Sequence, residues 1–185
     1  MKKVLFVLLA LCLFVVPVMA QEIDNPVVIN WEGDLEDAFI EREYAGKFYL
    51  FPDYGIQFLV PAGLDPMELN DEDAELGIFA FFMTENEEMQ VAAQFLDYEL
   101  ETLEEVAMWE KQNRGDDMKF AGFYKINGLD AIIFVDTESD VLVANVATSV
   151  PNHFIKVTIS PISNEELNSL SGFITGSIMP YSPEE

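Results

Sequence analysis

The stretch that decides the fold is residues 120–135, which read FAGFYKINGLDAIIFV. At its centre lies Asn127-Gly128, the dipeptide that suits a type I′ hairpin turn, because both central positions of that turn need a positive φ. The flanking segments, Phe120 to Ile126 and Leu129 to Val135, are rich in the aromatic and β-branched residues that favour strands. We therefore expect two antiparallel strands joined by a tight turn.

Three more pairs of strands are predicted on either side of this hairpin. They cover residues 47–51 with 56–60, 78–84 with 89–96, and 142–150 with 154–160. The first pair flanks Pro52-Asp53-Tyr54-Gly55, in which Pro presets φ and Gly comes last, as a type I turn prefers. In the last strand Ile155, Val157 and Ile159 share one face, while Lys156 and Thr158 share the other. Because every connection is short, neighbouring strands should be antiparallel.

Two helices interrupt the strands, and each opens with a capping-box pattern: Thr102-Leu103-Glu104-Glu105 and Ser163-Asn164-Glu165-Glu166. The first helix is predicted to run to about residue 113 with Leu103, Val106 and Ala107 inward, and Gly115 is its expected stop. The second is predicted to run to about Ile178, before Pro180. Its inward stripe comprises Leu167, Leu170, Ile174 and Ile178. Its internal Gly172 and Gly176 predict close packing on the sheet.

Two other segments have weaker patterns. Residues 31–46 leave helix and strand both open, because Leu35 and Phe39 fit a helix turn while Ala38, Ile40 and Tyr44 fit alternation. Residues 70–76 are predicted to form one acidic helical turn.

The first twenty residues have the pattern of a removable export signal. Lys2 and Lys3 precede the apolar run Val4 to Val16, Pro17 breaks the helix, and Ala20 ends a stretch of compact residues. A spanning helix needs roughly 20 apolar residues, so this run is too short for a retained anchor. Cys12 follows a bulky Leu instead of the small residue of a lipobox, which argues against lipidation. We expect the protein to be secreted or held in the cell envelope.

Composition narrows the function classes. The chain has 9 Lys and Arg, 34 Asp and Glu, one His and one Cys, with a formal net charge of −25. The only Cys lies in the leader, so the remaining 165 residues contain no disulfide, Cys-based metal site or cysteine nucleophile. Such acidity opposes binding to nucleic acid, whose phosphates need clustered Lys and Arg. It also keeps an exported protein dispersed.

We expect one domain over residues 47–180, preceded by the signal peptide at 1–20 and a segment of undecided structure at 21–46, and followed by a tail at 181–185. The order of elements is two hairpins, a helix, two hairpins and a closing helix. This order predicts an α+β fold in which helices flank a single antiparallel sheet on both faces, as an α/β/α sandwich.

The chain resembles the Mog1/PsbP-like fold, which many small exported bacterial proteins of unknown function share. The resemblance covers Phe51 to Pro180 and is carried by four features: Tyr54-Gly55-Ile56-Gln57-Phe58-Leu59-Val60-Pro61, the helix opening at Thr102, the hairpin Ile126-Asn127-Gly128-Leu129-Asp130-Ala131, and a final helix with Phe173 and Ser177. It implies a non-catalytic module that binds or stabilises a partner. Two known roles in this fold, binding of a Ran GTPase and service as an extrinsic photosystem II subunit, do not transfer residue by residue.

Candidate metal ligands are few. His153 is the only His, and a zinc site needs three or four ligands, so we interpret it as a polar turn residue. Asp71, Asp73 and Glu75 alternate as in an EF-hand loop, but Leu76 and Phe82 replace the Gly and Glu that the loop needs next. We therefore assign no metal-binding, cofactor-binding or catalytic residues.

Two further groups of residues are candidates for a functional role. Asp136, Glu138 and Asp140 lie in a predicted turn between strands, where paired carboxylates can act as acid and base, but turns also attract Asp for local hydrogen bonds. The adjacent Phe81 and Phe82 must point to opposite faces of a strand, so either both faces are covered or one ring is exposed for a partner.

The sequence thus predicts an exported, non-enzymatic binding or accessory module. Its expected partner is an envelope or extracellular protein, or a basic ligand, with no nucleic acid and no membrane insertion after signal cleavage. Two alternatives stay open: a Ca²⁺-responsive acidic module that uses Asp71–Glu75 or Asp136–Asp140, and a hydrolase without recognisable motifs. The identity of the partner and the oligomeric state are not predicted.

Overall fold

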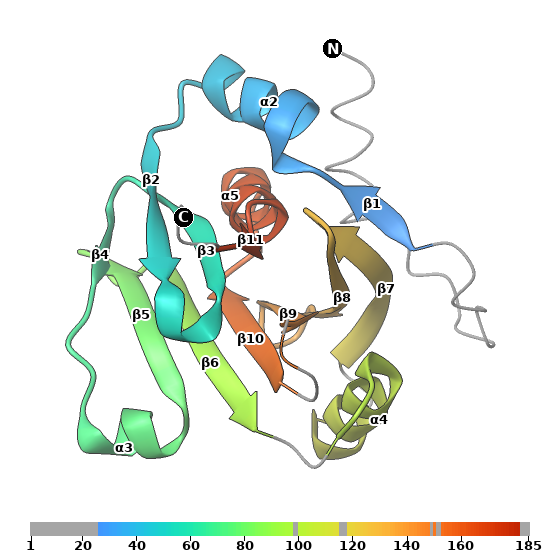
Figure 1. Cartoon of the computed structure of the whole chain (residues 1–185). Helices are drawn as coiled ribbons and strands as arrows, with labels where there is room; N and C mark the ends of the chain where they lie inside the picture. The colour runs from blue at the N-terminus through green and yellow to red at the C-terminus, as the bar shows by residue number, and fades with distance from the viewer. Residues whose placement is uncertain (1–25, 98–99, 115–117, 149, 151–152, 182–185) are drawn as a thin grey trace.

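The computed structural model describes residues 26–97, 100–114, 118–148, 150 and 153–181. The predicted signal peptide, Gly115 and most of the tail lie outside these residues. The described chain forms a large sheet, a small sheet and four helices (Figure 1). The helices are α2 (Glu36–Glu41), α3 (Asp71–Glu75), α4 (Leu103–Arg114) and α5 (Glu165–Gly176).

The large sheet has eight strands in the order β1-β7-β8-β9-β10-β6-β5-β4. The strands are β1 (Val27–Ile29), β4 (Leu64–Pro66), β5 (Ile78–Thr84), β6 (Gln90–Asp97), β7 (Met118–Ile126), β8 (Leu129–Asp136), β9 (Val141–Ala147) and β10 (His153–Ser160). The small sheet has the order β11-β3-β2, with β2 (Gly46–Phe51), β3 (Ile56–Pro61) and β11 (Met179–Pro180).

All four predicted hairpins are present and antiparallel. In the central one, Asn127 and Gly128 have φ values of 47° and 88°, as the turn chemistry requires. In the first, Pro52–Tyr54 forms a 3₁₀ turn and Gly55 has a φ of 65°. The α+β class is therefore confirmed.

The prediction of a single, wholly antiparallel sheet is wrong in two respects. β1 joins the edge of β7 in parallel, with Val27 opposite Tyr124. A parallel pair needs a long crossover, and here residues 30–117 lie between the two strands. The hairpin β2–β3 forms a separate sheet with β11, and nearly all of β3 is buried.

Residues 31–46, whose sequence pattern fits both a helix and a strand, begin with an irregular turn at Trp31–Leu35. This turn is followed by α2. Trp31, Leu35, Ala38 and Phe39 are buried in the same core as the strands. Phe39 packs edge-on against Phe173 of α5, with ring centroids 5.4 Å apart. This segment is thus part of the same hydrophobic core as the domain predicted from residue 47.

α5 differs from its prediction at both ends. Asn164, and not Ser163, is the N-cap, because its side-chain oxygen accepts the Leu167 amide hydrogen at 2.9 Å. The helix ends at Gly176, and the hydroxyl of Ser177 accepts the Leu59 amide hydrogen at 2.9 Å. A Cβ on Gly176 would lie 2.6 Å from Leu35 Cδ1, so the close packing is against the N-terminal segment.

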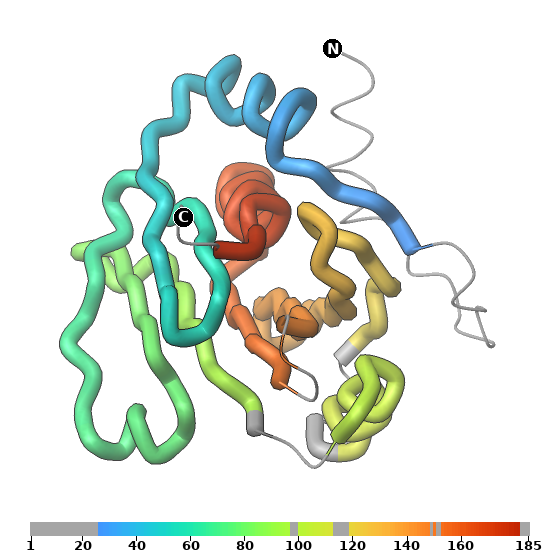
Figure 2. The backbone as a smooth tube through the Cα atoms, in the orientation of Figure 1, coloured from blue at the N-terminus to red at the C-terminus, as the bar shows by residue number. Residues whose placement is uncertain are grey.

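The two faces of the large sheet have different covers. Ile155, Val157 and Ile159 lie in the main core with α5 and β3, which agrees with their predicted common face. The opposite face, around Phe154 and Ile132, packs on α4 in two smaller clusters. Figure 2 shows α5 inside the molecule, between the small sheet and the β7 side of the large sheet, with α4 outside.

α4 begins as predicted. Thr102 Oγ accepts the Glu105 amide hydrogen at 3.2 Å, and a Glu105 carboxylate oxygen accepts the Thr102 amide hydrogen at 3.2 Å, which completes the capping box.

Candidate functional site

The acidic segment at residues 71–75 is a short helix, α3, and not a loop. Asn70 caps it by accepting the amide hydrogens of Glu72 and Asp73, and the Asp73 carboxylate accepts the Asn70 amide hydrogen. Successive helical residues are separated by about 100°, so Asp71 and Asp73 point in different directions. The predicted helical turn is confirmed, and the local hydrogen bonds account for Asp73.

The second acidic group lies between β8 and β9, where two of its carboxylates bind backbone. Asp136 Oδ1 accepts the amide hydrogens of Glu138 and Ser139 at 2.9 and 3.0 Å. Asp140 Oδ1 accepts the Ile162 amide hydrogen at 3.1 Å. Asp136 thus has the local role that Asp takes in turns, whereas Asp140 joins this turn to the segment that follows β10.

His153 is the first residue of β10 and is half-buried. Its ring meets Phe95 edge-on, with centroids 5.0 Å apart. Among the described residues, no group of three or more His, Cys, Asp and Glu side chains lies close enough together to hold a metal ion.

The adjacent rings of β5 divide between the faces of the sheet. Phe82 is 2% exposed and packs on Tyr49 and Phe58 of the small sheet, whereas Phe81 is half-buried on the other face. Phe82, Tyr49 and Phe58 therefore fill part of the space between the two sheets.

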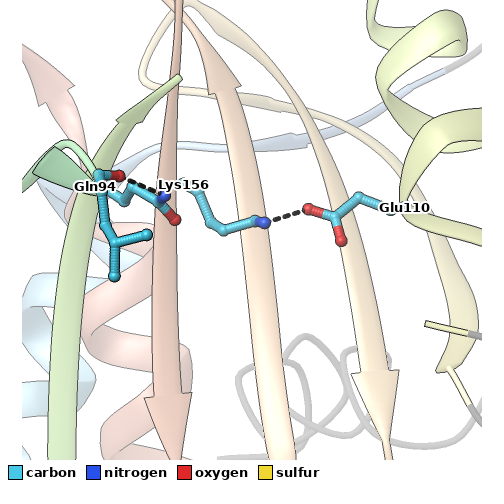
Figure 3. A network of polar contacts seen from close by, with 4 residues as sticks. Gln94, Glu110 and Lys156 are labelled. Atoms are coloured by element: carbon cyan, nitrogen blue, oxygen red, sulfur yellow. Dashed lines mark hydrogen bonds and ion pairs between the residues drawn. The ribbon is translucent and has the colours of Figure 1, made fainter. Parts of the chain in front are cut away.

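A row of polar side chains crosses the face of the large sheet that α4 covers. Gln94, Lys156 and Asn145 are direct neighbours on β6, β10 and β9. Lys156 extends toward the helix, and its Nζ lies 2.5 Å from a Glu110 carboxylate oxygen (Figure 3). The Lys156 ammonium also lies 5.5 Å from the centroid of the Trp109 ring. The side chains of Lys156 and Glu110 are 6% and 0% exposed.

This ion pair lies between α4 and the sheet. Leu103, Val106, Ala107 and Glu110 occupy positions i, i+3, i+4 and i+7, which lie on one face of a helix. The first three pack on apolar side chains, and Glu110 meets the ammonium of Lys156. A buried charge needs a partner, since desolvation costs several kcal/mol for each ion.

Asn145 lies beside this pair and is fully buried. Neither its amide nitrogen nor its amide oxygen has a hydrogen-bond partner among the described residues. An unsatisfied buried polar group costs about 1–3 kcal/mol. Gln94, at the other end of the row, donates to the Leu76 carbonyl at 2.6 Å.

Sequence analysis missed Glu110 and Asn145. Glu110 follows Leu103 by seven residues and so extends the inward stripe, which is a signal that the sequence contains. Asn145 occupies an ordinary position in a predicted strand. Its burial depends on α4 lying above β9, which no local pattern indicates.

Besides the buried ion pair, the structure has an exposed strand edge on the small sheet. Among the strands that the structure describes, β2 pairs with β3 alone, and β3 separates it from β11. The Leu59 amide hydrogen binds Ser177 Oγ on the side away from β2. Phe48, the partner of Leu59, is therefore in a non-hydrogen-bonded pair, and its own N–H and C=O point away from β3.

Backbone groups alternate in direction along a strand, so the residues two positions before and two positions after Phe48 point the same way as Phe48. Gly46, Phe48 and Leu50 thus direct their backbone N–H and C=O groups to the outside of the sheet, and we call these groups the open edge. No hydrogen bond of the described residues uses them. The side chains of Phe48 and Leu50 lie on one face of the strand and are 37% and 52% exposed. Exposed, unpaired strand edges are templates for another strand.

In the part of the chain that the structure describes, no helix has the length and apolar character to cross a bilayer.

The comparisons with known proteins agree with this architecture. No protein-family model matches the sequence, and the search of curated proteins also gives no match. Among solved structures, the cyanobacterial PsbP protein CyanoP of Synechocystis is similar, with a TM-score of 0.52 and 14% identity over 74% of this chain and 93% of that one.

Two other solved structures have lower scores. The Ran-binding protein Mog1p of Saccharomyces cerevisiae has a TM-score of 0.47 and 10% identity over 73% of this chain and 95% of that one. A protein of Bacteroides thetaiotaomicron has a TM-score of 0.45 and 11% identity over 74% of this chain and 49% of that one.

The chain therefore has the Mog1/PsbP-like fold, an α+β fold with a large, mostly antiparallel sheet and helices, and the predicted resemblance is confirmed. Identities this low establish the fold alone.

Proposed function

We propose that this protein is an exported, non-catalytic binding module that engages a partner in the cell envelope or outside the cell. The observation that carries the proposal is the open edge of β2. Exposed there are two large apolar side chains, Phe48 and Leu50, beside backbone groups without partners. A strand edge with unpaired backbone groups can serve as a template for pairing with another chain.

Two further observations support the proposal. Three of the six acids that are candidates for metal binding or catalysis, Asp73, Asp136 and Asp140, accept hydrogen bonds from backbone amides. The N-terminal pattern of two Lys residues, an apolar run and Pro17 supports export.

Site-specific photo-crosslinking in the cells that make the protein tests the proposal. A photoreactive residue replaces Leu50 in one variant and Met108 in the other. Met108 is a matched control, because it is 58% exposed on α4 and Leu50 is 52% exposed on β2.

We expect a discrete cross-linked product outside the cytoplasm from position 50 and none from position 108. Equal labelling from both positions, or no product from either, would contradict a binding role for the β2 edge. A cross-link formed only in the cytoplasm would contradict export.

A further inference from the structure

The geometry of β2 also indicates which backbone conformation a binding partner would adopt. The open edge offers three N–H and three C=O groups at every second residue, from Gly46 to Leu50. An extended chain has the same spacing of donors and acceptors and can pair with them as an added strand. A helix or a folded convex surface has no free backbone groups with which to do so.

The side chains of β2 indicate which residue types would fit in the central part of the partner segment. Phe48 and Leu50 point to one face, where alternate residues of an added strand would also lie. The Phe48 ring is held edge-on against Trp31, with centroids 5.7 Å apart at 84°. Because this contact orients the ring in the free protein, less side-chain freedom is lost on binding. Apolar or β-branched residues at alternate positions would fit here.

The charges near the two ends of β2 indicate which charge would suit the two ends of the partner segment. Glu41 and Glu43 precede the strand, Asp53 follows it, and all three are exposed. The one basic residue of the strand, Lys47, places its ammonium 4.5 Å from the centroid of the Tyr49 ring. Tyr49 packs on Phe82 of the large sheet, so this contact lies on the face opposite Phe48 and Leu50. Carboxylates at both ends favour a segment that carries Lys or Arg at both ends.

The net charge of the chain argues against a second copy of this chain as the partner at the open edge. Each copy has a formal net charge of −25, so pairing two β2 strands would bring like charges together.

We propose that β2 is a docking strand for an extended segment of another protein, apolar at alternate central positions and basic at both ends. This inference rests on the proposed binding function and specifies its mode, strand addition.

Selection from random eight-residue peptides displayed on phage, with the purified protein as the target, tests this mode. We expect enriched peptides to share alternating apolar residues and terminal Lys or Arg. A synthetic copy of one enriched peptide then serves as the probe, beside a copy with N-methyl groups on the residues that pair with β2. N-methylation removes backbone donors and keeps the side chains, so it should weaken binding at least tenfold.

Two variants at one position separate backbone from side-chain recognition. Leu50→Pro removes an N–H of the open edge, and edge strands tolerate Pro where the N–H faces outward. Leu50→Val keeps the N–H and an apolar side chain. We expect the probe to bind Leu50→Val within threefold of the wild type and Leu50→Pro at least tenfold more weakly. Thermal unfolding of both variants shows whether the fold is intact.

A third variant tests the charges. Replacing Glu41 and Glu43 with Gln and Asp53 with Asn should weaken the probe severalfold at low salt and flatten the salt dependence of its binding.

Three outcomes would overturn strand addition: no enrichment, equal binding of the N-methylated probe, or equal binding to folded Leu50→Pro and Leu50→Val. If photo-crosslinking at position 50 still captures a partner, the binding function stands and only the mode fails.

Discussion

Lys156 and Glu110 form a buried ion pair. The pair lies between β10 and α4, away from water, at an N–O distance of 2.5 Å. Such a pair has a small net effect on stability, because desolvation offsets the attraction between the charges. Removing one partner is different, because it leaves an uncompensated charge in the interior.

We predict that Lys156→Met lowers the free energy of unfolding by about 3–5 kcal/mol, since Glu110 then stays buried without its cation. Urea-induced unfolding, followed by circular dichroism, measures this change. The double variant Lys156→Met with Glu110→Leu removes both charges and should return to the wild-type value or exceed it. A double variant as unstable as Lys156→Met would mean that the charges themselves are needed to hold α4.

The sequence shows this site only in part. The inward position of Glu110 follows from its spacing to Leu103, and the shared face of Lys156 and Thr158 was predicted from alternation. That these faces meet depends on where α4 lies in space, which local periodicity does not encode. The open edge of β2 was missed for a similar reason, because the partition of strands between two sheets decides which edges stay unpaired.

Among the elements, the β7–β8 turn has a second role besides reversing the chain. Asn127 Oδ1 accepts the Trp31 amide hydrogen at 2.6 Å, and its Nδ2 donates to the carbonyls of Gly176 and Ile178 at 2.9 and 2.7 Å. One amide therefore ties the N-terminal segment and the end of α5 to the large sheet.

We predict that Asn127→Gly lowers the free energy of unfolding by about 2–4 kcal/mol, because three hydrogen bonds contribute roughly 0.5–1.5 kcal/mol each. Glycine keeps the positive φ of the turn, so the substitution adds no backbone strain there. Asn127→Asp should be worse, since a carboxylate oxygen would then face two carbonyls. Unfolding in urea gives both values, and a loss below 0.5 kcal/mol for Asn127→Gly would show that the amide does not join these elements.

The elements that sequence analysis predicted well are those with local signals. The four hairpins have turn residues such as Asn127-Gly128, and α4 has its capping box. β1, β4 and β11 have only two or three residues each and no periodicity, so they were missed. Ser163 and Asn164 both suit an N-cap, and the difference of one residue at α5 depends on the backbone conformation at Asn164.

The charge of the whole molecule makes its stability depend on salt. With 34 acidic and 9 basic residues, self-repulsion should dominate at low ionic strength, where screening is weak. We predict that the melting temperature rises by several degrees between 10 mM and about 300 mM NaCl. A melting temperature that is constant or falls would show that surface repulsion is not a major term.

We expect Ca²⁺ to affect the melting temperature only by screening the negative charges. Asp73, Asp136 and Asp140 bind backbone amides, so we expect a Ca²⁺ titration followed by calorimetry to be silent up to millimolar metal, and Ca²⁺ to match Mg²⁺ in melting experiments at equal ionic strength. A saturable heat of binding would favour the cation-responsive alternative.

Amide hydrogen exchange along β2, followed by NMR in the free protein, tests the central claim most directly. The account predicts an alternating pattern: fast exchange at Gly46, Phe48 and Leu50, whose N–H groups form the open edge, and protection at Lys47, Tyr49 and Phe51, which pair with β3. Equal protection of Phe48 and Tyr49 would show that the edge is already paired, and would contradict a docking role for β2.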